Sequence, residues 1–308
     1  MRSNMKYILA IDAGGTFFKS CIIGQNGEMV GDEVKKVPVD SDGGSEIILN
    51  AYREIISGAL IFAKSHDMVL AGIGISTPGP FDYVGFKSLM KHKFAGIYGI
   101  NLRDEIIRRC FLPAGPDNFD IKFIHDAHAF ILGEYWKGAA RGYSHIAGVT
   151  IGTGTGFGCM SGGKIKANEN GGPYVSIYSL PCRDGILEDY VSGKGIVNIY
   201  RKLSGECGNG RDAKEIGRLA ESGKDKYAVA AYREAGEILA IAIKEILTDL
   251  EIECLVLGGQ ISRSFALMEE AIAGNLAGVK TLKKVCMAQN IDFSPLFGAA
   301  LAVSGNQT

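Results

Sequence analysis

Two glycine-rich segments of similar layout could bind phosphate. The first covers residues 11–17 (IDAGGTF) and the second covers residues 151–157 (IGTGTGF). Glycine has no Cβ, so backbone N–H groups can gather around an anion, and neighbouring threonine hydroxyls add further donors. A polyphosphate needs donors of this kind. The two segments therefore predict a pair of phosphate loops that act on one nucleotide, with these candidate donors: Gly14, Gly15, Thr16, Gly152, Thr153, Gly154 and Thr155.

Each glycine-rich segment lies between two stretches that are typical of strands. A short apolar stretch precedes each one, at 7–11 and 145–151, and an extended stretch follows, at 19–23 and 157–161. This arrangement predicts the turn of a β-hairpin and differs from the strand-to-helix turn of a Rossmann loop. Lys19 is not part of a Walker-type pattern. It is expected near the phosphates, with its role left open.

Composition restricts the classes of partner. The 308 residues suit two domains, each large enough to bury a core. Lys and Arg total 33 against 34 Asp and Glu, which gives a net charge of -1. A chain without excess positive charge has no electrostatic footprint for nucleic acid or for an anionic membrane. We therefore expect a small-molecule partner, with no nucleic acid and no membrane.

Cysteine usage and hydropathy indicate a cellular location. The seven cysteines include no Cys-x-x-Cys pair, which favours reduced thiols over a disulfide framework. The first apolar run, 7–11, is too short for a signal peptide, and no stretch reaches the ~18 apolar residues of a membrane span. We therefore expect a soluble, cytoplasmic protein.

The order of predicted elements is repeated in the two halves. In the first half, an amphipathic helix over 46–66 leads to a strand over 69–76 and then to a Thr-Pro-Gly-Pro turn. In the second half, a helix over 228–250 leads to a strand over 254–257 and then to Gly258 and Gly259. The repeat predicts duplication of a hairpin–helix–strand plan. Further elements are predicted as a strand over 121–124 and helices over 102–110, 127–137, 188–203, 212–222 and 294–303.

Taken together, the motifs resemble those of the ROK family (repressor, open reading frame, kinase) of the sugar-kinase, actin and Hsp70 superfamily. The resemblance rests on the order and spacing of several motifs along nearly the whole chain. The matching segments are 12–19 (first phosphate motif), 76–80 (sugar-side turn), 125–129 (Asn-Asp-Ala-Asn catalytic segment), 152–158 (second phosphate motif), 257–259 (adenosine motif) and 298–300 (C-terminal signature).

The resemblance implies a fold and a domain plan. The fold is α/β, a duplicated actin/hexokinase-like (ribonuclease H-like) fold whose two lobes enclose a nucleotide cleft. Residues 1–125 would form the N-terminal lobe with the sugar side and the first phosphate loop. Residues 126–293 would form the C-terminal lobe with the second phosphate loop and the adenosine site. Residues 294–308 would form a helix that packs back on the N-terminal lobe. The resemblance, and nothing else in the sequence, suggests a homodimer.

The resemblance also implies ATP-dependent phosphorylation of a sugar hydroxyl, on a hexose, an N-acetylhexosamine or a related carbohydrate. Asp126 would act as general base, and Asp12 would orient Mg²⁺ through water. Gly258 and Gly259 would contact adenosine. Asp126 is also in a position where a helix N-cap is common. His125 and His128 do not suggest a metal site, because side chains at a strand-to-helix junction are expected to diverge.

The departures from the family pattern lie on the sugar side. The family's Glu-x-x-His pair corresponds to Val175 and Tyr178, which offer no carboxylate. Only Cys182 remains where the family has a zinc-binding cysteine cluster, so no structural zinc is expected. The resemblance implies a sugar site formed by Thr77, Pro78, Gly79, Lys93, His125, Asp126, Tyr178 and Glu188.

Two of these side chains have a second interpretation. Glu188 could accept hydrogen bonds from sugar hydroxyls or serve as a carboxylate at a helix N-terminus. Lys93 could select an acidic or phosphorylated sugar or simply be solvated. Ordinary glucose specificity is therefore not expected.

Two rival functions were weighed against the kinase. A ROK repressor needs a helix-turn-helix before the kinase-like part, whereas the first strand is expected at about residue 5. The second rival is a catalytically reduced, regulatory protein that binds sugar or nucleotide. Asp126 and both phosphate motifs favour the enzyme, while Val175 and Tyr178 favour the regulator.

Overall fold

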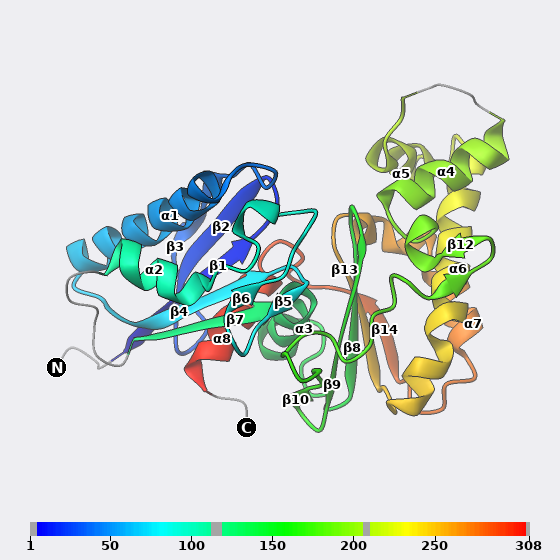
Figure 1. Ribbon diagram of the computed structural model, residues 1–308. Coiled ribbons are helices and arrows are strands. Elements are labelled where there is room, and N and C mark those ends of the chain that lie inside the picture. Colours follow the sequence, from blue (N-terminus) through cyan, green and yellow to red (C-terminus); the bar gives the residue numbers. More distant parts are fainter. Residues whose placement is uncertain (1–4, 112–118, 206–209, 306–308) are drawn as a thin grey trace. The chain divides into compact units, whose positions relative to one another are not determined.

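The computed structural model of the chain describes residues 5–111, 119–205 and 210–305 (Figure 1). These residues form two compact units. The first unit contains the described residues up to Lys137, together with Ala167–Pro173 and the C-terminal segment from Phe293. The second contains Gly138–Lys166 and the described part of Tyr174–Asp292.

The first unit is built on a five-stranded sheet. Its strands are β1 (Lys6–Ala13), β2 (Phe17–Gly24), β3 (Met29–Pro38), β4 (Val69–Thr77) and β7 (Asp120–His125), in the order β3-β2-β1-β4-β7. The strands β3, β2 and β1 are antiparallel, whereas β1, β4 and β7 are parallel. The carboxyl ends of the three parallel strands therefore meet at one edge of the sheet.

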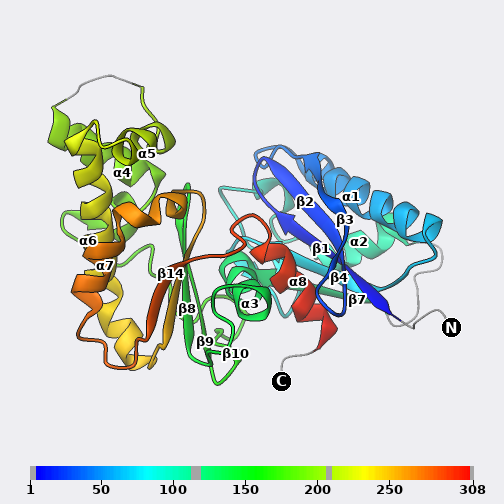
Figure 2. The ribbon, with the colours of Figure 1, turned by 180° about the vertical axis from the view of Figure 1, so that it is seen from behind.

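Helices cover both faces of this sheet, as Figures 1 and 2 show. Alternate residues of a strand point to opposite faces. On β1, Leu9 and Ile11 pack in one core with α1 (Ser45–Ser65) and α2 (Leu102–Cys110). On the same strand, Ile8 and Ala10 pack in another core with α8 (Ser294–Ser304), next to α3 (Asp126–Lys137). Shorter elements of the unit are β5 (Phe81–Asp82), β6 (Lys87–Ser88) and the 3₁₀ turn η1 (Ala95–Ile97).

The second unit repeats the strand plan of the first. Its sheet contains β8 (Ile146–Ile151), β9 (Thr155–Ser161), β10 (Lys164–Ile165), β13 (Cys254–Gly258) and β14 (Lys284–Met287), in the order β10-β9-β8-β13-β14. Again the first three strands are antiparallel and the last three are parallel. The duplication predicted from the sequence is confirmed.

The helices of the second unit pack around α6 (Lys226–Asp249). This long helix contacts α4 (Gly193–Ser204), α5 (Ala213–Glu221) and α7 (Glu269–Leu276). It buries one apolar stripe that includes Leu239 and Ile243. Short elements complete the unit: β11 (Pro181–Cys182), β12 (Gly185–Ile186), η2 (Leu187–Asp189) and η3 (Ile261–Leu267).

Most of the predicted elements are present near their expected bounds, but α7 and β14 were not predicted. The sequence analysis placed residues 126–137 in the second lobe, whereas contacts group α3 with the first unit. The reason is that α3 packs along α8, which itself lies against β1 and β4.

The crossing of α3 and α8 leaves no room for side chains at two glycines. A Cβ on Gly298 would lie 1.8 Å from the carbonyl oxygen of Ala129, and one on Gly133 would lie 2.0 Å from that of Ser294. The same helix α8 approaches β4, because a Cβ on Gly74 would lie 1.9 Å from the carbonyl oxygen of Ala299. Small residues thus hold α8 close to both the sheet and α3.

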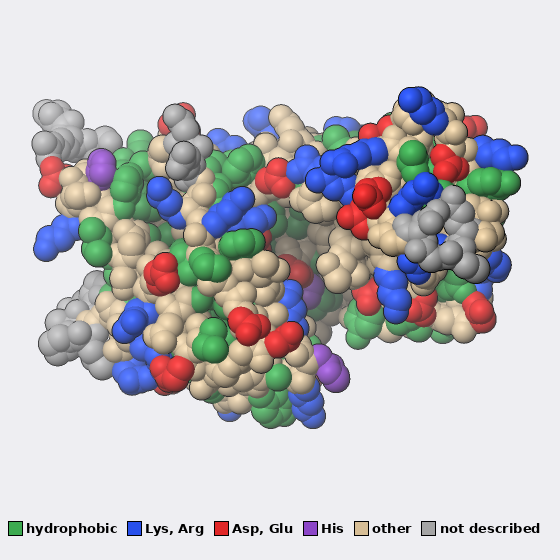
Figure 3. All heavy atoms as spheres, turned by 90° about the horizontal axis from the view of Figure 1, so that it is seen from above, with side chains coloured by type: hydrophobic (Ala, Val, Ile, Leu, Met, Phe, Trp, Pro, Cys, Tyr) green, Lys and Arg blue, Asp and Glu red, His purple; other side chains and the backbone are tan. Residues whose placement is uncertain are grey.

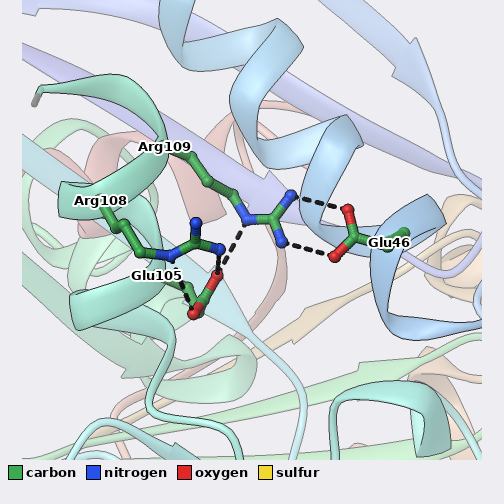
Figure 4. Close-up of polar contacts among 4 residues, drawn as sticks. All are labelled: Glu46, Glu105, Arg108 and Arg109. Atoms are coloured by element: carbon green, nitrogen blue, oxygen red, sulfur yellow. Dashed lines mark hydrogen bonds and ion pairs between the residues drawn. The ribbon is translucent and has the colours of Figure 1, made fainter.

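A polar clip joins α1 to α2 (Figure 4). The Arg109 guanidinium donates two hydrogen bonds to the Glu46 carboxylate, at 2.7 and 3.0 Å, and its Nε donates to Glu105 at 2.9 Å. Arg108 also donates to Glu105. These hydrogen bonds lower the pKa of Glu46 and Glu105 from their usual values. Because Glu46 is exposed, the clip orients α2 more than it stabilises the fold.

The surface and the sulfur chemistry of the described chain show no unusual bias. Basic and acidic side chains are interspersed on the face seen in Figure 3. No helix among the described residues has the length and apolar character that crossing a membrane requires. The six described cysteines form no disulfide with one another, and Cys207 lies outside the described residues.

The tight crossing makes a prediction about stability. Gly298→Ala should lower the free energy of unfolding by about 3 kcal/mol, because the new methyl group meets rigid backbone. Gly58→Ala on α1 is the matched control, since a Cβ there meets nothing within 4 Å. That control should raise stability by about 0.5 to 1 kcal/mol. Urea denaturation of both variants checks this, and a Gly298→Ala protein as stable as the original would contradict the packing described.

Candidate functional site

The carboxyl edge of the first sheet gathers several predicted site residues. In the strand register, Asp12 of β1 lies beside Ser76 of β4, and Thr77 of β4 lies beside His125 of β7. Asp126 follows directly as the first residue of α3. Two carboxylates, a hydroxyl and an imidazole are therefore positioned by three parallel strands.

Asp12 is half-buried and carries a perturbed carboxylate. Its Oδ1 accepts a hydrogen bond from Ser76 Oγ at 3.2 Å. Burial raises the pKa of Asp12 above its usual 3.8, the charge of Lys19 opposes this shift, and the nearby Asp126 adds to it. Lys19 lies directly across the hairpin from Asp12. The site therefore holds an incompletely neutralised carboxylate that a cation would stabilise.

Asp126 is the more open of the two carboxylates, with 47% of its side chain exposed. Its Oδ1 accepts a hydrogen bond from the N–H of Ala127 at 2.7 Å and lies 3.2 Å from His125 Nδ1. An N-cap side chain would instead accept from an N–H two or three residues further on. The second carboxylate oxygen has no hydrogen bond within the described chain, so it can accept a proton from a bound hydroxyl.

The sugar-side turn follows β4 and lies against His125. Thr77 is buried, and its carbonyl oxygen accepts a hydrogen bond from Tyr83 Oη at 3.1 Å. The Tyr83 ring contacts the His125 ring edge-on, with centroids 5.9 Å apart. A Cβ on Gly79 would lie 3.6 Å from the His125 ring and 3.6 Å from the Tyr83 hydroxyl, and Pro78 precedes it. The turn and His125 thus form one surface.

Lys93 lies over the first hairpin turn. Its Cε is 2.6 Å from the position that a Cβ on Gly15 would take, and its charge lowers the pKa of Asp12. The lysine packs close to the turn only because residue 15 has no side chain. Gly14 N–H donates to Asp12 O at 3.1 Å, and Thr16 is exposed at the tip. The basic group therefore faces the predicted phosphate loop.

The second unit brings its glycine-rich turn together with the Gly258–Gly259 pair. Gly258 pairs with Thr150 of β8, next to the turn. Gly259 has φ of +84°, and a Cβ there would lie 2.3 Å from the carbonyl oxygen of Ile151. Only glycine fits this combination of conformation and contact. Gly152 and the exposed Thr153 lie in the same turn.

Thr155 and Glu188 are in contact, although they lie 33 residues apart in the sequence. The Glu188 carboxylate accepts a hydrogen bond from the N–H of Thr155 at 2.7 Å. The Thr155 hydroxyl donates to the carbonyl oxygen of Val191, so it is already engaged. Sequence reasoning had no signal for this pairing. Of the other positions discussed in this unit, Val175 packs against the core. The Tyr178 side chain is exposed, and the backbone carbonyl oxygen of Tyr178 accepts a hydrogen bond from the Glu188 N–H.

His128 was not predicted as a site residue. The sequence analysis expected His125 and His128 to diverge, and this was wrong: their rings meet edge-on with centroids 5.5 Å apart. They meet because His125 ends β7 and the first turn of α3 carries His128 back toward it. His128 is buried, and its Nε2 has no hydrogen-bond partner in the described chain. No group of three or more His, Cys, Asp or Glu suited to a metal ion is found among the described residues.

The buried histidine makes a prediction about pH. Burial, together with the smaller effect of the nearby His125 charge, lowers the pKa of His128 from 6.5 to about 3. Between those values the unfolded chain binds more protons, so stability falls with falling pH by up to about 1.4 kcal/mol per unit. His128→Asn should remove this contribution. In urea denaturation from pH 7 to pH 4, the free energy of unfolding of His128→Asn should depend less on pH than that of the original chain. The His92→Asn control, at an exposed position, should keep the original dependence. Equal slopes for all three proteins would refute the assignment.

Comparison with known proteins places the chain in a family. The model of the ROK family matches residues 8–305. The chain is 26% identical over 280 residues to a glucokinase of Thermotoga maritima, covering 83% of each chain. It is 26% identical over 311 residues to an N-acetylmannosamine kinase of Escherichia fergusonii, covering 97% of this chain and 99% of that one.

A solved structure confirms the fold predicted from the sequence. The structure of a ROK family glucokinase from Streptomyces griseus in complex with glucose and AMPPNP superposes with a TM-score of 0.76 at 21% identity. The match covers 97% of this chain and 99% of that chain. The α/β, duplicated actin/hexokinase-like fold is therefore that of the ROK sugar kinases. The chain belongs to the ROK family, and the relatives that it resembles in sequence are carbohydrate kinases.

Proposed function

We propose that the chain phosphorylates a sugar hydroxyl with ATP and that Asp126 is the general base. The observation that carries this proposal is the position of the Asp126 carboxylate, half-exposed at the sheet edge that also holds Asp12 and the first phosphate turn. Family membership supports the reaction class. Family membership does not identify the particular sugar.

To catalyse phosphoryl transfer, a protein mainly has to position the reacting groups and stabilise charge. Asp126 would accept the proton of the attacking hydroxyl as the oxygen attacks phosphorus. General-base assistance of this kind contributes roughly 10² to 10⁴-fold. The Ala127 N–H, which donates to Asp126 Oδ1 at 2.7 Å and also to His125 Nδ1 at 3.2 Å, keeps the carboxylate oriented.

The residues around Asp12 fit Mg²⁺ and phosphate. Mg²⁺ prefers oxygen ligands and keeps several waters, and a half-buried carboxylate with a raised pKa gains from a nearby cation. We propose that Asp12 binds the ion through water. When bound, Mg²⁺ supplies charge neutralisation on the phosphates. Lys19 and Lys93 both add positive charge close to Asp12.

We assign the second unit to the remainder of the nucleotide. The N–H groups of Thr153 and Gly154 would bind phosphate, and the Gly258–Gly259 pair would pass close to the adenosine. Because residue 259 has no side chain, its backbone packs directly against that of Ile151 beside the turn.

The sugar is proposed as a hexose or an N-acetylhexosamine. Thr77, Pro78, Gly79 and His125 form the surface beside Asp126 that would hold it. Val175 is partly buried against the core of the second unit and offers no hydrogen bond from its side chain. A site with different donors and acceptors rejects the wrong sugar, because each unmatched buried polar group costs about 1 to 3 kcal/mol.

A second candidate function is a regulatory protein of the ROK type that binds sugar or nucleotide without efficient turnover. The observation that favours it is the absence of a carboxylate at Val175 and Tyr178. Turnover separates the two functions, because both predict binding and only the kinase predicts release of ADP.

The first test is a screen of sugar-dependent ADP release over hexoses, N-acetylhexosamines, amino sugars and glycosides. With the best sugar, Asp126→Asn should lower kcat by roughly 10² to 10⁴-fold and leave nucleotide affinity nearly unchanged. Glu54→Gln is the control, because it makes the same charge change at an exposed position of α1. Activity that survives in Asp126→Asn would remove Asp126 from the mechanism, and binding without ADP release for every sugar would favour the regulator.

Lys93 supports a second test. Because Lys93 lies over Gly15, we expect it to act on the phosphate and not on the sugar. Lys93→Met should then lower kcat/KM by a similar factor for every neutral sugar that is a substrate, roughly tenfold for one charge-assisted contact. Steady-state kinetics on two or more sugars decides this. A loss confined to acidic or phosphorylated sugars would instead show that Lys93 selects the substrate.

A further inference from the structure

The second phosphate turn, residues 152–155, is held at three points by one segment, residues 187–193. Gly193 N–H donates to Gly152 O at 2.8 Å at one end of the turn. At the other end, Thr155 N–H donates to Glu188 Oε2 at 2.7 Å, and the Thr155 hydroxyl donates to Val191 O. Thr155 is buried by these contacts. The holding segment, as we call residues 187–193, therefore fixes both ends of the turn.

The holding segment is itself firmly anchored in the second unit. Leu187 and Val191 are fully buried in its core, on either side of Glu188. Leu187 N–H donates to Leu180 O at 2.9 Å, Val191 N–H donates to Leu187 O at 2.8 Å, and Glu188 N–H donates to Tyr178 O at 3.0 Å. The backbone that carries the Glu188 side chain is thus fixed by burial and by hydrogen bonds.

The approach of Glu188 explains why residue 154 is glycine. A Cβ at this position would lie 2.6 Å from Glu188 Oε2. A side chain at residue 154 and the carboxylate of Glu188 cannot both occupy their places. Glycine at residue 154 and the contact from Glu188 to Thr155 therefore belong to one arrangement.

The same contacts decide which N–H groups of the turn can meet an anion. Gly152 N–H donates to Gly154 O at 2.9 Å, and Thr155 N–H is taken by Glu188. In the described chain, the N–H groups of Thr153 and Gly154 make no hydrogen bond. Glu188 therefore fixes the backbone on one side of the two donors that remain.

We infer that Glu188 is a positioning residue, which holds the second turn so that Thr153 and Gly154 bind a nucleotide phosphate. This inference rests on the proposed function and assigns Glu188 to the nucleotide instead of the sugar. What the turn requires is an acceptor for the Thr155 N–H, and a negative charge next to a phosphate is unfavourable. A glutamine at this position keeps the acceptor and removes the charge.

The test measures the Kd of the nucleotide analogue AMPPNP with Mg²⁺ by titration calorimetry on the full chain. Glu188→Ala should raise this Kd roughly tenfold, as expected for the loss of one hydrogen bond to a charged group. Glu188→Gln should bind as tightly as the original protein or more tightly. The KM of the sugar should be unchanged in Glu188→Gln. Asp189→Ala is the matched control, because Asp189 accepts from Ile186 N–H and does not touch the turn.

A double-mutant cycle tests the coupling to residue 154. Gly154→Ala alone should raise the Kd of AMPPNP, since the methyl group displaces Glu188 or the turn. In the Glu188→Ala background the same change should have a clearly smaller effect. Additive effects of the two changes would contradict the steric part of the argument.

The outcomes separate this inference from the proposed function. If the original chain binds no AMPPNP, both fail. If it binds AMPPNP and Glu188→Ala binds equally well, only the positioning inference fails. A raised sugar KM in Glu188→Gln with unchanged nucleotide Kd would return Glu188 to the sugar site. Should Glu188→Ala not fold, Glu188→Gln still decides between these results, because weaker AMPPNP binding in that variant would overturn the inference.

Discussion

The parallel register of β1, β4 and β7 is the constraint on which the first site depends. Parallel strands end at the same edge, so residues far apart in sequence, Asp12, Thr77 and Asp126, become neighbours there. On one face of the sheet, α8 supports this register, because it approaches β4 at Gly74 without an intervening side chain. A larger residue at that contact would push α8 off the sheet that aligns the carboxylates.

The two units use one strand plan for different chemistry. In the first, Asp12 lies near the end of β1, just before the hairpin turn, and Asp126 follows β7 at the same edge of the sheet. In the second, the turn lies beside β13, which ends in glycine, and the donors are backbone N–H groups. Duplication thus supplies equivalent positions in the two units. Under the proposed function, the residues that follow each strand would decide whether a position binds a cation and a hydroxyl or an anion and a ring.

Local patterns predicted much of this arrangement and missed what depends on distant contacts. The hairpin turns, α1, and Asp126 at the start of a helix all follow from short-range signals. The helix α7 buries only Ile272 and Leu276, and β14 has three partly buried residues and one exposed residue, so neither gives a strong periodic signal. The contact of Glu188 with Thr155 joins residues 33 apart and has no sequence pattern at all.

Each glycine-rich turn that we propose to bind phosphate has a carboxylate beside it, although phosphate and carboxylate repel each other. At the second turn, Glu188 is bound to backbone and acts as an acceptor, so its charge is partly compensated by the Thr155 N–H. At the first turn, the Asp12 carboxylate accepts one hydrogen bond from the described residues, that of the Ser76 hydroxyl, and burial raises its pKa. The raised pKa means that the ionised carboxylate is less stable there than in water. A carboxylate in that state gains from a nearby cation. Under the proposed function the two acids would therefore have opposite tasks: Glu188 would fix a backbone that meets phosphate, and Asp12 would attract the positive charge that phosphate requires.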